Sequence, residues 1–169
     1  MSGEHKYSYA VKGIVYLCEY DEENFTPGAA FECFQIVQNL LKHYVDWFLP
    51  KSHAKAAILR LPKMKIVADT IRKHLNINEQ MYVHICNMTE IYDALTVHSR
   101  FRVITRYEYA QLHNTAEDVV NWFFDNLTAE MKRKLVKELR IKSEDDWLSM
   151  KPREFKEWIK FYTISHFKL

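Results

Sequence analysis

The chain has 169 residues, of which 48% are hydrophobic and 14% aromatic, with only three Gly and four Pro. This composition can build a core without disulfides or metal ions, and it excludes an intrinsically disordered chain. Many large side chains with few breakers favour long packed elements over a loop-rich β-sandwich. We therefore expect a single domain spanning residues 1–169, with residues 1–6 flexible.

The net charge is only +2, but it is distributed unevenly. Residues 1–50 carry three Lys against seven Asp and Glu, whereas residues 51–106 carry ten Lys and Arg against four acids. The basic middle third is a candidate contact for an acidic partner. Alternatively, it is a solvated face that offsets the acidic first third.

The three cysteines, Cys18, Cys33 and Cys86, are an odd number and form no CxxC pair. This usage favours reduced thiols and an intracellular location, either cytoplasmic or nuclear. The polar first residues lead us to expect no secretory leader. No run of about eighteen apolar residues is present, so the sequence predicts no membrane span.

The first two elements are predicted to be a strand and a long helix. Alternation at Tyr7, Tyr9 and Val11, followed by an apolar run, predicts a strand over residues 7–17, with Gly13 as a possible bulge. An acidic loop over residues 19–24 follows. Thr26 is a suitable N-cap for a helix that is expected to end at residue 49. Apolar residues at three-four spacing lie on one stripe of this helix: Phe34, Val37, Leu41, Tyr44 and Phe48. It should therefore be central and largely buried, with a polar strip that includes Lys42 facing water.

The middle of the chain predicts shorter elements. We expect helical turns over residues 51–60 and a helix over residues 63–75. A further helix should begin after an N-cap at Asn76 or Asn78 and end at residue 95. Residues 101–105 are a second strand candidate, able to pair with the first or to form a hairpin arm.

The C-terminal third predicts a helix over residues 107–113. It also predicts a second helix that begins at Asn114 or Thr115 and ends at residue 127. Thr128 starts another, to residue 140. Ser143 and Asp146 approximate a capping box, and residue 152 opens the last helix. The predicted fold class is mainly α, with six or seven helices and a small β element in one compact domain.

Known catalytic and metal-binding patterns are missing from the sequence. The eight histidines contain no HxxxH pair, and neither GxSxG nor a glycine-rich phosphate loop occurs. We therefore predict no metal site, no cofactor and no catalytic residue. An enzyme whose site is assembled from distant positions is kept as the third alternative.

Basic and aromatic residues interleave over residues 98–107. On a strand, these arginines could face a phosphate backbone, as in a β-wing beside two DNA-reading helices. The candidate nucleic-acid contacts are Arg60, Lys63, Lys65, Arg72, Lys73, Arg100, Arg102 and Arg106. An ordinary surface is the alternative for this patch, and we interpret the second basic stretch, residues 132–142, as a solvated helix face.

The aromatic residues exceed what one stripe per helix can bury. Phe161 and Tyr162 are adjacent, so one of them must leave the buried stripe. Exposed aromatic residues anchor protein interfaces, which makes Trp147, Trp158, Phe161 and Tyr162 candidate interface residues, although buried central helices could also absorb them. Our leading hypothesis is a non-enzymatic regulatory protein that binds a protein partner through an aromatic and basic surface. A nucleic-acid-binding protein is the alternative, and no membrane partner is expected. The composition resembles that of small viral or phage accessory proteins.

Overall fold

The computed structural model describes residues 7–60, 64–74, 77–94 and 104–169, and the predictions for residues 1–6 lie outside these ranges. In the described residues the chain forms eight α-helices, one 3-10 turn and no strand. The elements are α1 (Tyr9–Glu19), α2 (Pro27–Phe48), α3 (His53–Arg60), α4 (Met64–His74), α5 (Glu79–Asp93), α6 (Arg106–Asp125), α7 (Ala129–Glu138), η2 (Trp147–Ser149) and α8 (Pro152–Phe167). The mainly α class is confirmed. The helices outnumber the six or seven expected, because the first predicted strand is a helix.

Helix α1 replaces the strand predicted over residues 7–17, so this part of the predicted small β element is wrong, and no strand is seen in the described residues. Ser8 is the N-cap, and its hydroxyl oxygen accepts the Val11 N–H at 3.3 Å. A Cβ built on Gly13 would lie 2.6 Å from Cδ2 of Leu40, so Gly13 is the point where α1 crosses α2 closely, not a bulge. Strand propensity is a weak preference that depends on a neighbouring strand. Burial of a helical stripe on α2 outweighs it here.

The second predicted strand, residues 101–105, falls largely outside the described residues. Thr105, which is described, is the N-cap of α6 and forms a capping box with Glu108. Residues 106–125 are one continuous helix, so the predicted break at Asn114 or Thr115 is wrong. Thr115 does not cap a new helix, because its hydroxyl donates to the Gln111 carbonyl at 2.8 Å, one turn back along the same helix. This bond satisfies the hydroxyl within a continuing helix.

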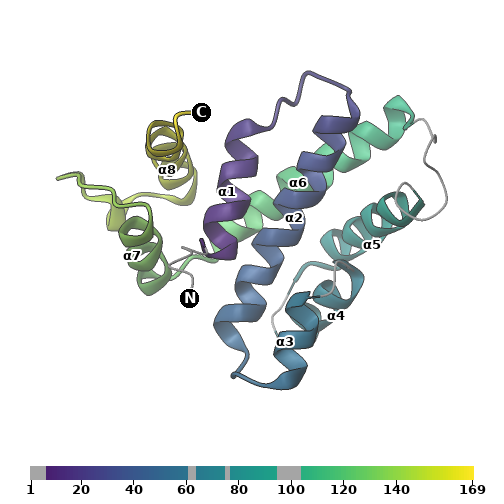
Figure 1. Cartoon of the computed structure of the whole chain (residues 1–169), viewed down its shortest axis with the longest axis horizontal. Helices are drawn as coiled ribbons and strands as arrows, with labels where there is room; N and C mark the ends of the chain where they lie inside the picture. Colours follow the sequence, from purple (N-terminus) through teal and green to yellow (C-terminus); the bar gives the residue numbers. More distant parts are fainter. Residues whose placement is uncertain (1–6, 61–63, 75–76, 95–103) are drawn as a thin grey trace, which may run out of the picture.

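Helix α2 is the centre of the fold, as the sequence predicts. It packs against α1, α6, α4 and α3, and it forms an antiparallel pair with α1 (Figure 1). Thr26 is its N-cap and accepts the Ala29 N–H at 3.1 Å. Two side chains depart from the expected stripes: Phe48 is 46% exposed, and Lys42 is buried at 8% exposure. The polar strip of α2 is therefore covered at Lys42 by α1.

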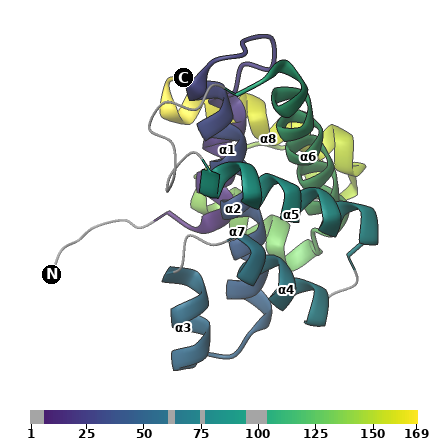
Figure 2. The same ribbon diagram turned by 90° about the vertical axis from the view of Figure 1, so that its right-hand side faces the viewer.

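Two flanks surround the central pair α2 and α6. Helices α7 and α8 lie on one flank, and α3, α4 and α5 lie on the other (Figures 1 and 2). One contiguous hydrophobic cluster joins α2 and α6 with both flanks. The buried Tyr44 hydroxyl donates to the Phe123 carbonyl at 2.8 Å, which fixes α2 to α6. Among the described helices, none is both long and apolar enough to cross a membrane.

Of the other helix caps predicted from the sequence, two are confirmed and one is wrong. Asn78 and Thr128 cap α5 and α7, as predicted. The capping box predicted at Ser143 and Asp146 is wrong, because the Ser143 hydroxyl oxygen accepts the Asp145 N–H and Asp146 makes no side-chain cap. Only the three-residue 3-10 turn η2 follows.

Candidate functional site

The four aromatic residues proposed as an interface lie together in a single row. The ring centroids of Trp147 and Trp158 are 6.2 Å apart, those of Trp158 and Tyr162 are 4.9 Å apart, and those of Tyr162 and Phe161 are 5.3 Å apart. We call this row, Trp147–Trp158–Tyr162–Phe161, the aromatic ladder. It runs from η2 along α8.

The inner end of the ladder is fixed to the core. Phe155 is fully buried, and its ring centroid lies 5.8 Å from Trp158 and 6.4 Å from Trp147. The indole N–H of Trp158 donates to Asp145 Oδ2 at 3.0 Å. Both tryptophans are therefore half-buried packing residues, held in one orientation by ring contacts and a hydrogen bond.

The outer end of the ladder faces solvent. Phe161 is 63% exposed, and Ile164, which lies one turn further along α8, is 39% exposed. Residues three apart share one face of a helix, so these two side chains form a small apolar patch. Of the four predicted interface residues, only Phe161 exposes most of its surface to solvent.

A basic helix face adjoins the ladder. Lys132 Nζ lies 5.0 Å from the centroid of the Phe155 ring and donates to the Met150 carbonyl at 3.5 Å. The next residues around α7 are exposed, and they include Arg133 and Lys137. Lys132 thus connects the basic face of α7 to the base of the aromatic ladder.

The described part of the chain places five of the predicted nucleic-acid contacts on three helices, α3, α4 and α6. Arg60, Lys65, Arg72 and Lys73 are exposed on α3 and α4. Arg106 is exposed at the start of α6, an end of that helix distant from α4 in both views (Figures 1 and 2). The remaining candidates, Lys63, Arg100 and Arg102, lie outside the described residues. The site therefore stays a prediction.

One of these basic residues is already engaged. Arg72 pairs with Glu79 at 2.8 Å, and its guanidinium carbon lies 4.3 Å from the centroid of the Tyr82 ring. A phosphate group would have to compete with this carboxylate, which weakens the case for Arg72 as a nucleic-acid contact.

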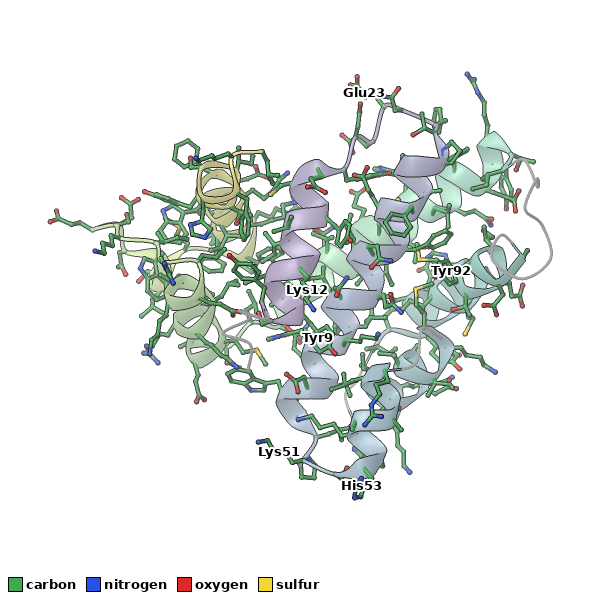
Figure 3. The ribbon with its side chains drawn as sticks, viewed as in Figure 1. Tyr9, Lys12, Glu23, Lys51, His53 and Tyr92 are labelled. Carbon is green, nitrogen blue, oxygen red and sulfur yellow. The ribbon has the colours of Figure 1, made fainter. Side chains whose placement is uncertain are left out.

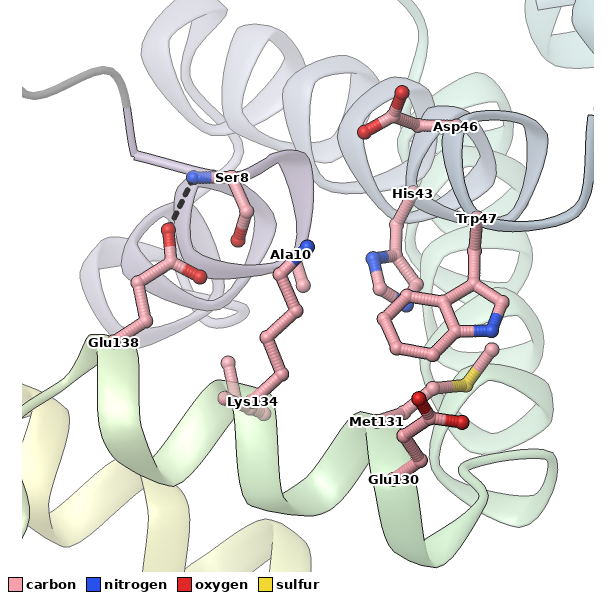
Figure 4. A pocket seen from close by; sticks show the side chains of 10 residues that line it. Ser8, Ala10, His43, Asp46, Trp47, Glu130, Met131, Lys134 and Glu138 are labelled. Atoms are coloured by element: carbon pink, nitrogen blue, oxygen red, sulfur yellow. Dashed lines mark hydrogen bonds between the residues drawn. The ribbon is translucent and has the colours of Figure 1, made fainter. Parts of the chain in front are cut away.

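A cavity of about 410 Å³ lies between the start of α1, the C-terminal half of α2 and α7 (Figure 4). The Ser8 N–H donates to Glu138 Oε1 at 2.5 Å and ties α1 to α7 at the cavity edge. Lys134 Nζ lies 5.3 Å from the centroid of the Trp47 ring. Three carboxylates also line the cavity: Asp46, Glu130 and Glu138.

His43 is the most unusual residue in the cavity wall. It is 9% exposed, and its buried Nε2 atom has no hydrogen-bond partner. Burial, together with the nearby Lys134 charge, lowers the pKa of His43 to about 4, although Asp46 acts in the opposite direction. His43 is therefore neutral near pH 7. Sequence reasoning could see His43 and Trp47 one turn apart on a helix, but not the α7 residues that face them.

The described residues contain no group of three or more His, Cys, Asp or Glu side chains that could hold a metal ion. Comparison of the chain with protein-family models, with curated proteins and with solved structures gives no match in any of the three.

Proposed function

We propose that this chain is a non-enzymatic, intracellular interaction protein that binds a protein partner through the outer end of the aromatic ladder. The single observation that carries the proposal is the exposure of Phe161, at 63%, on a rigidly packed row of rings. The three unpaired cysteines support an intracellular setting, where thiols stay reduced.

Rigid support makes Phe161 a better anchor than an isolated exposed ring. A side chain that is already ordered loses little conformational entropy when a partner binds. Phe161 contacts Tyr162, which contacts Trp158, and Trp158 is hydrogen-bonded to Asp145. Large aromatic side chains of this kind supply most of the binding energy at many protein interfaces.

The basic face of α7 adds a second property to the surface. Arg133 and Lys137 are exposed there, and Lys132 contacts the ladder base. Positive charge on the same flank as an apolar anchor would accelerate association with an acidic partner and would make the association rate dependent on salt. A protein partner with an acidic rim around an apolar pocket fits both properties.

The test is affinity capture from nuclease-treated cell extract with three forms of the protein. We expect the wild-type chain to capture one stoichiometric protein and Phe161→Glu to lose it, because a carboxylate cannot enter an apolar pocket without a large desolvation cost. Tyr107→Glu is the matched control, since Tyr107 is 72% exposed on α6, away from the ladder.

Three results would contradict the proposal. Capture that is unchanged in Phe161→Glu would exclude the ladder as the contact. Capture that disappears after nuclease treatment would favour nucleic acid as the partner instead. Recovery of no stoichiometric protein by the wild-type chain would remove the support for an interaction protein.

A further inference from the structure

Two lysines converge on one tyrosine ring at the seam between α1 and α2. Lys12 Nζ lies 5.2 Å and Lys42 Nζ lies 5.9 Å from the centroid of the Tyr9 ring. Tyr9 and Lys12 are adjacent on the side of α1 that borders α2 (Figure 3). Lys42 comes from α2, so the antiparallel pairing of the two helices brings both ammonium groups to the ring of Tyr9.

Neither ammonium group is neutralised within the described ranges. Lys12 and Lys42 form no ion pair there, and the Tyr9 hydroxyl makes no hydrogen bond. Burial and, to a smaller extent, the charge of Asp46 one turn further along α2 raise the pKa of Tyr9, but the Asp46 carboxylate is itself paired with Lys55. Lys55 Nζ lies 3.1 Å from Asp46 Oδ1 and also donates to the Asp46 carbonyl at 2.7 Å.

The stem of the Lys42 side chain is buried, but its ammonium group reaches the surface. Lys42 is 8% exposed, and Glu32 Oε2 and His43 Nε2, not Lys42 Nζ, are the buried polar atoms without a partner among the described residues, so an anion can approach this ammonium group from solvent. Its pKa is lowered by burial and, to a smaller extent, by the charge of Lys12. The two like charges share one ring, and each therefore disfavours the other. A bound anion would offset this repulsion and favour the charged form of Lys42.

We propose that Tyr9, Lys12 and Lys42 form a binding site for a phosphate group. Two ammonium groups near one ring match a divalent oxyanion better than a carboxylate, which supplies a single charge. The Tyr9 hydroxyl provides a further hydrogen-bond donor in the same cluster. This site goes beyond the proposed function, because it uses no residue of the aromatic ladder and requires no protein partner.

The phosphate group could be inorganic phosphate or a phosphate monoester, and two probes distinguish these sources. We propose titrating the full chain with inorganic phosphate and with phenyl phosphate at pH 8, where both are mainly divalent. Binding is followed by calorimetry and by the unfolding temperature. Acetate at matched ionic strength reports the effect of a monovalent carboxylate and of general screening.

We expect phosphate or phenyl phosphate to bind and to raise the unfolding temperature, as any ligand specific for the native state does. Lys12→Met and Lys42→Met should each weaken binding at least tenfold. Methionine keeps an unbranched apolar side chain at the buried position 42. Lys51→Met removes an exposed lysine after the end of α2 and should leave the affinity unchanged.

Tighter binding of phenyl phosphate than of inorganic phosphate would identify a monoester as the ligand, and the reverse would identify free phosphate; either order supports the site. Absence of binding by both probes would overturn the proposal. So would equal binding in the Lys12 variant, or acetate binding as tightly as phosphate. If Lys42→Met fails to fold, Lys12→Met and Tyr9→Phe decide the question, because Lys12 is exposed and Tyr9→Phe removes only a hydroxyl.

Discussion

The two flanks of the α2–α6 centre differ in how their polar and aromatic side chains are satisfied. On the α3–α4–α5 flank, Arg72 is paired with Glu79, and the Tyr82 hydroxyl donates to Asp69. On the α7–α8 flank, a row of packed rings ends at Phe161, which faces solvent. An excess of charge in the sequence pointed to the first flank. The two flanks therefore differ at these residues: Arg72 and Tyr82 have polar partners, whereas the Phe161 ring is 63% exposed.

The largest effect that separates the flanks is expected at the base of the ladder. Phe155→Ala should reduce the free energy of unfolding by about 3–5 kcal/mol, because it removes a fully buried ring and leaves a cavity. The measurement is denaturant unfolding followed by two probes. A loss below about 1 kcal/mol would show that the ladder is not anchored in the core as described.

The second effect is a dependence of the unfolding free energy on pH, which should come from His43, the residue that faces α7. The pKa of His43 is about 4 in the folded chain against 6.5 for the unperturbed group. Above pH 6.5 the imidazole is neutral in both states, and its contribution to stability is fully present. As the pH falls below 6.5, the unfolded chain binds a proton first, so the folded state loses up to about 3 kcal/mol by pH 4.

His43→Phe provides the control for this prediction. Phenylalanine can keep ring contacts to Trp47 and Phe123 while it removes the unpartnered Nε2. The variant should flatten the dependence of unfolding free energy on pH between 6.5 and 4. An unaltered slope in His43→Phe would contradict the assignment.

A smaller effect is expected at the α1–α2 crossing, which supports both flanks. Gly13→Ala brings a methyl group against the buried Leu40, and overpacking of this kind costs about 1–3 kcal/mol. Alanine also favours a helix over glycine by about 1 kcal/mol. The net result should be a loss of about 1 kcal/mol, measured as a shift in the denaturant midpoint. A stabilised variant would mean that α1 can move away from α2 at no cost.

The smallest effect compares one exposed residue from each flank. Arg72→Ala and Phe161→Ala should each change the unfolding free energy by no more than about 0.5 kcal/mol, since both side chains are exposed. Only Phe161→Ala should weaken partner capture. If Arg72→Ala weakens capture instead, the contact surface is on the α3–α4 flank.

Several elements of the fold could be predicted because their signals are local. Thr26, Asn78 and Thr128 accept backbone N–H groups at helix starts, and each precedes an apolar helical stripe. Such caps depend only on a few neighbouring residues. Residue 115 shows the limit of the same reasoning. A threonine inside a helix can bond back to the preceding turn, so its presence alone does not mark a new helix.

Part of the candidate interface could also be predicted from the sequence. Phe161 and Tyr162 are adjacent, so the period of a helix requires one of them to leave the buried side. The stacking of Trp147 on Trp158 could not be predicted, because it depends on the path of the chain from α7 to η2. The same holds for Lys132, whose contact with Phe155 crosses from α7 to α8.

The sequence by itself determined the mainly α class, the position of the central helix and most helix starts, because periodicity and capping act over a few residues. Only the tertiary structure decided that residues 9–19 form a helix, since burial against α2 outweighs their strand propensity. The tertiary structure also decided which charged side chains lie close to each other. Lys12 and Lys42 are thirty positions apart, and only the antiparallel packing of α1 on α2 brings both to the ring of Tyr9.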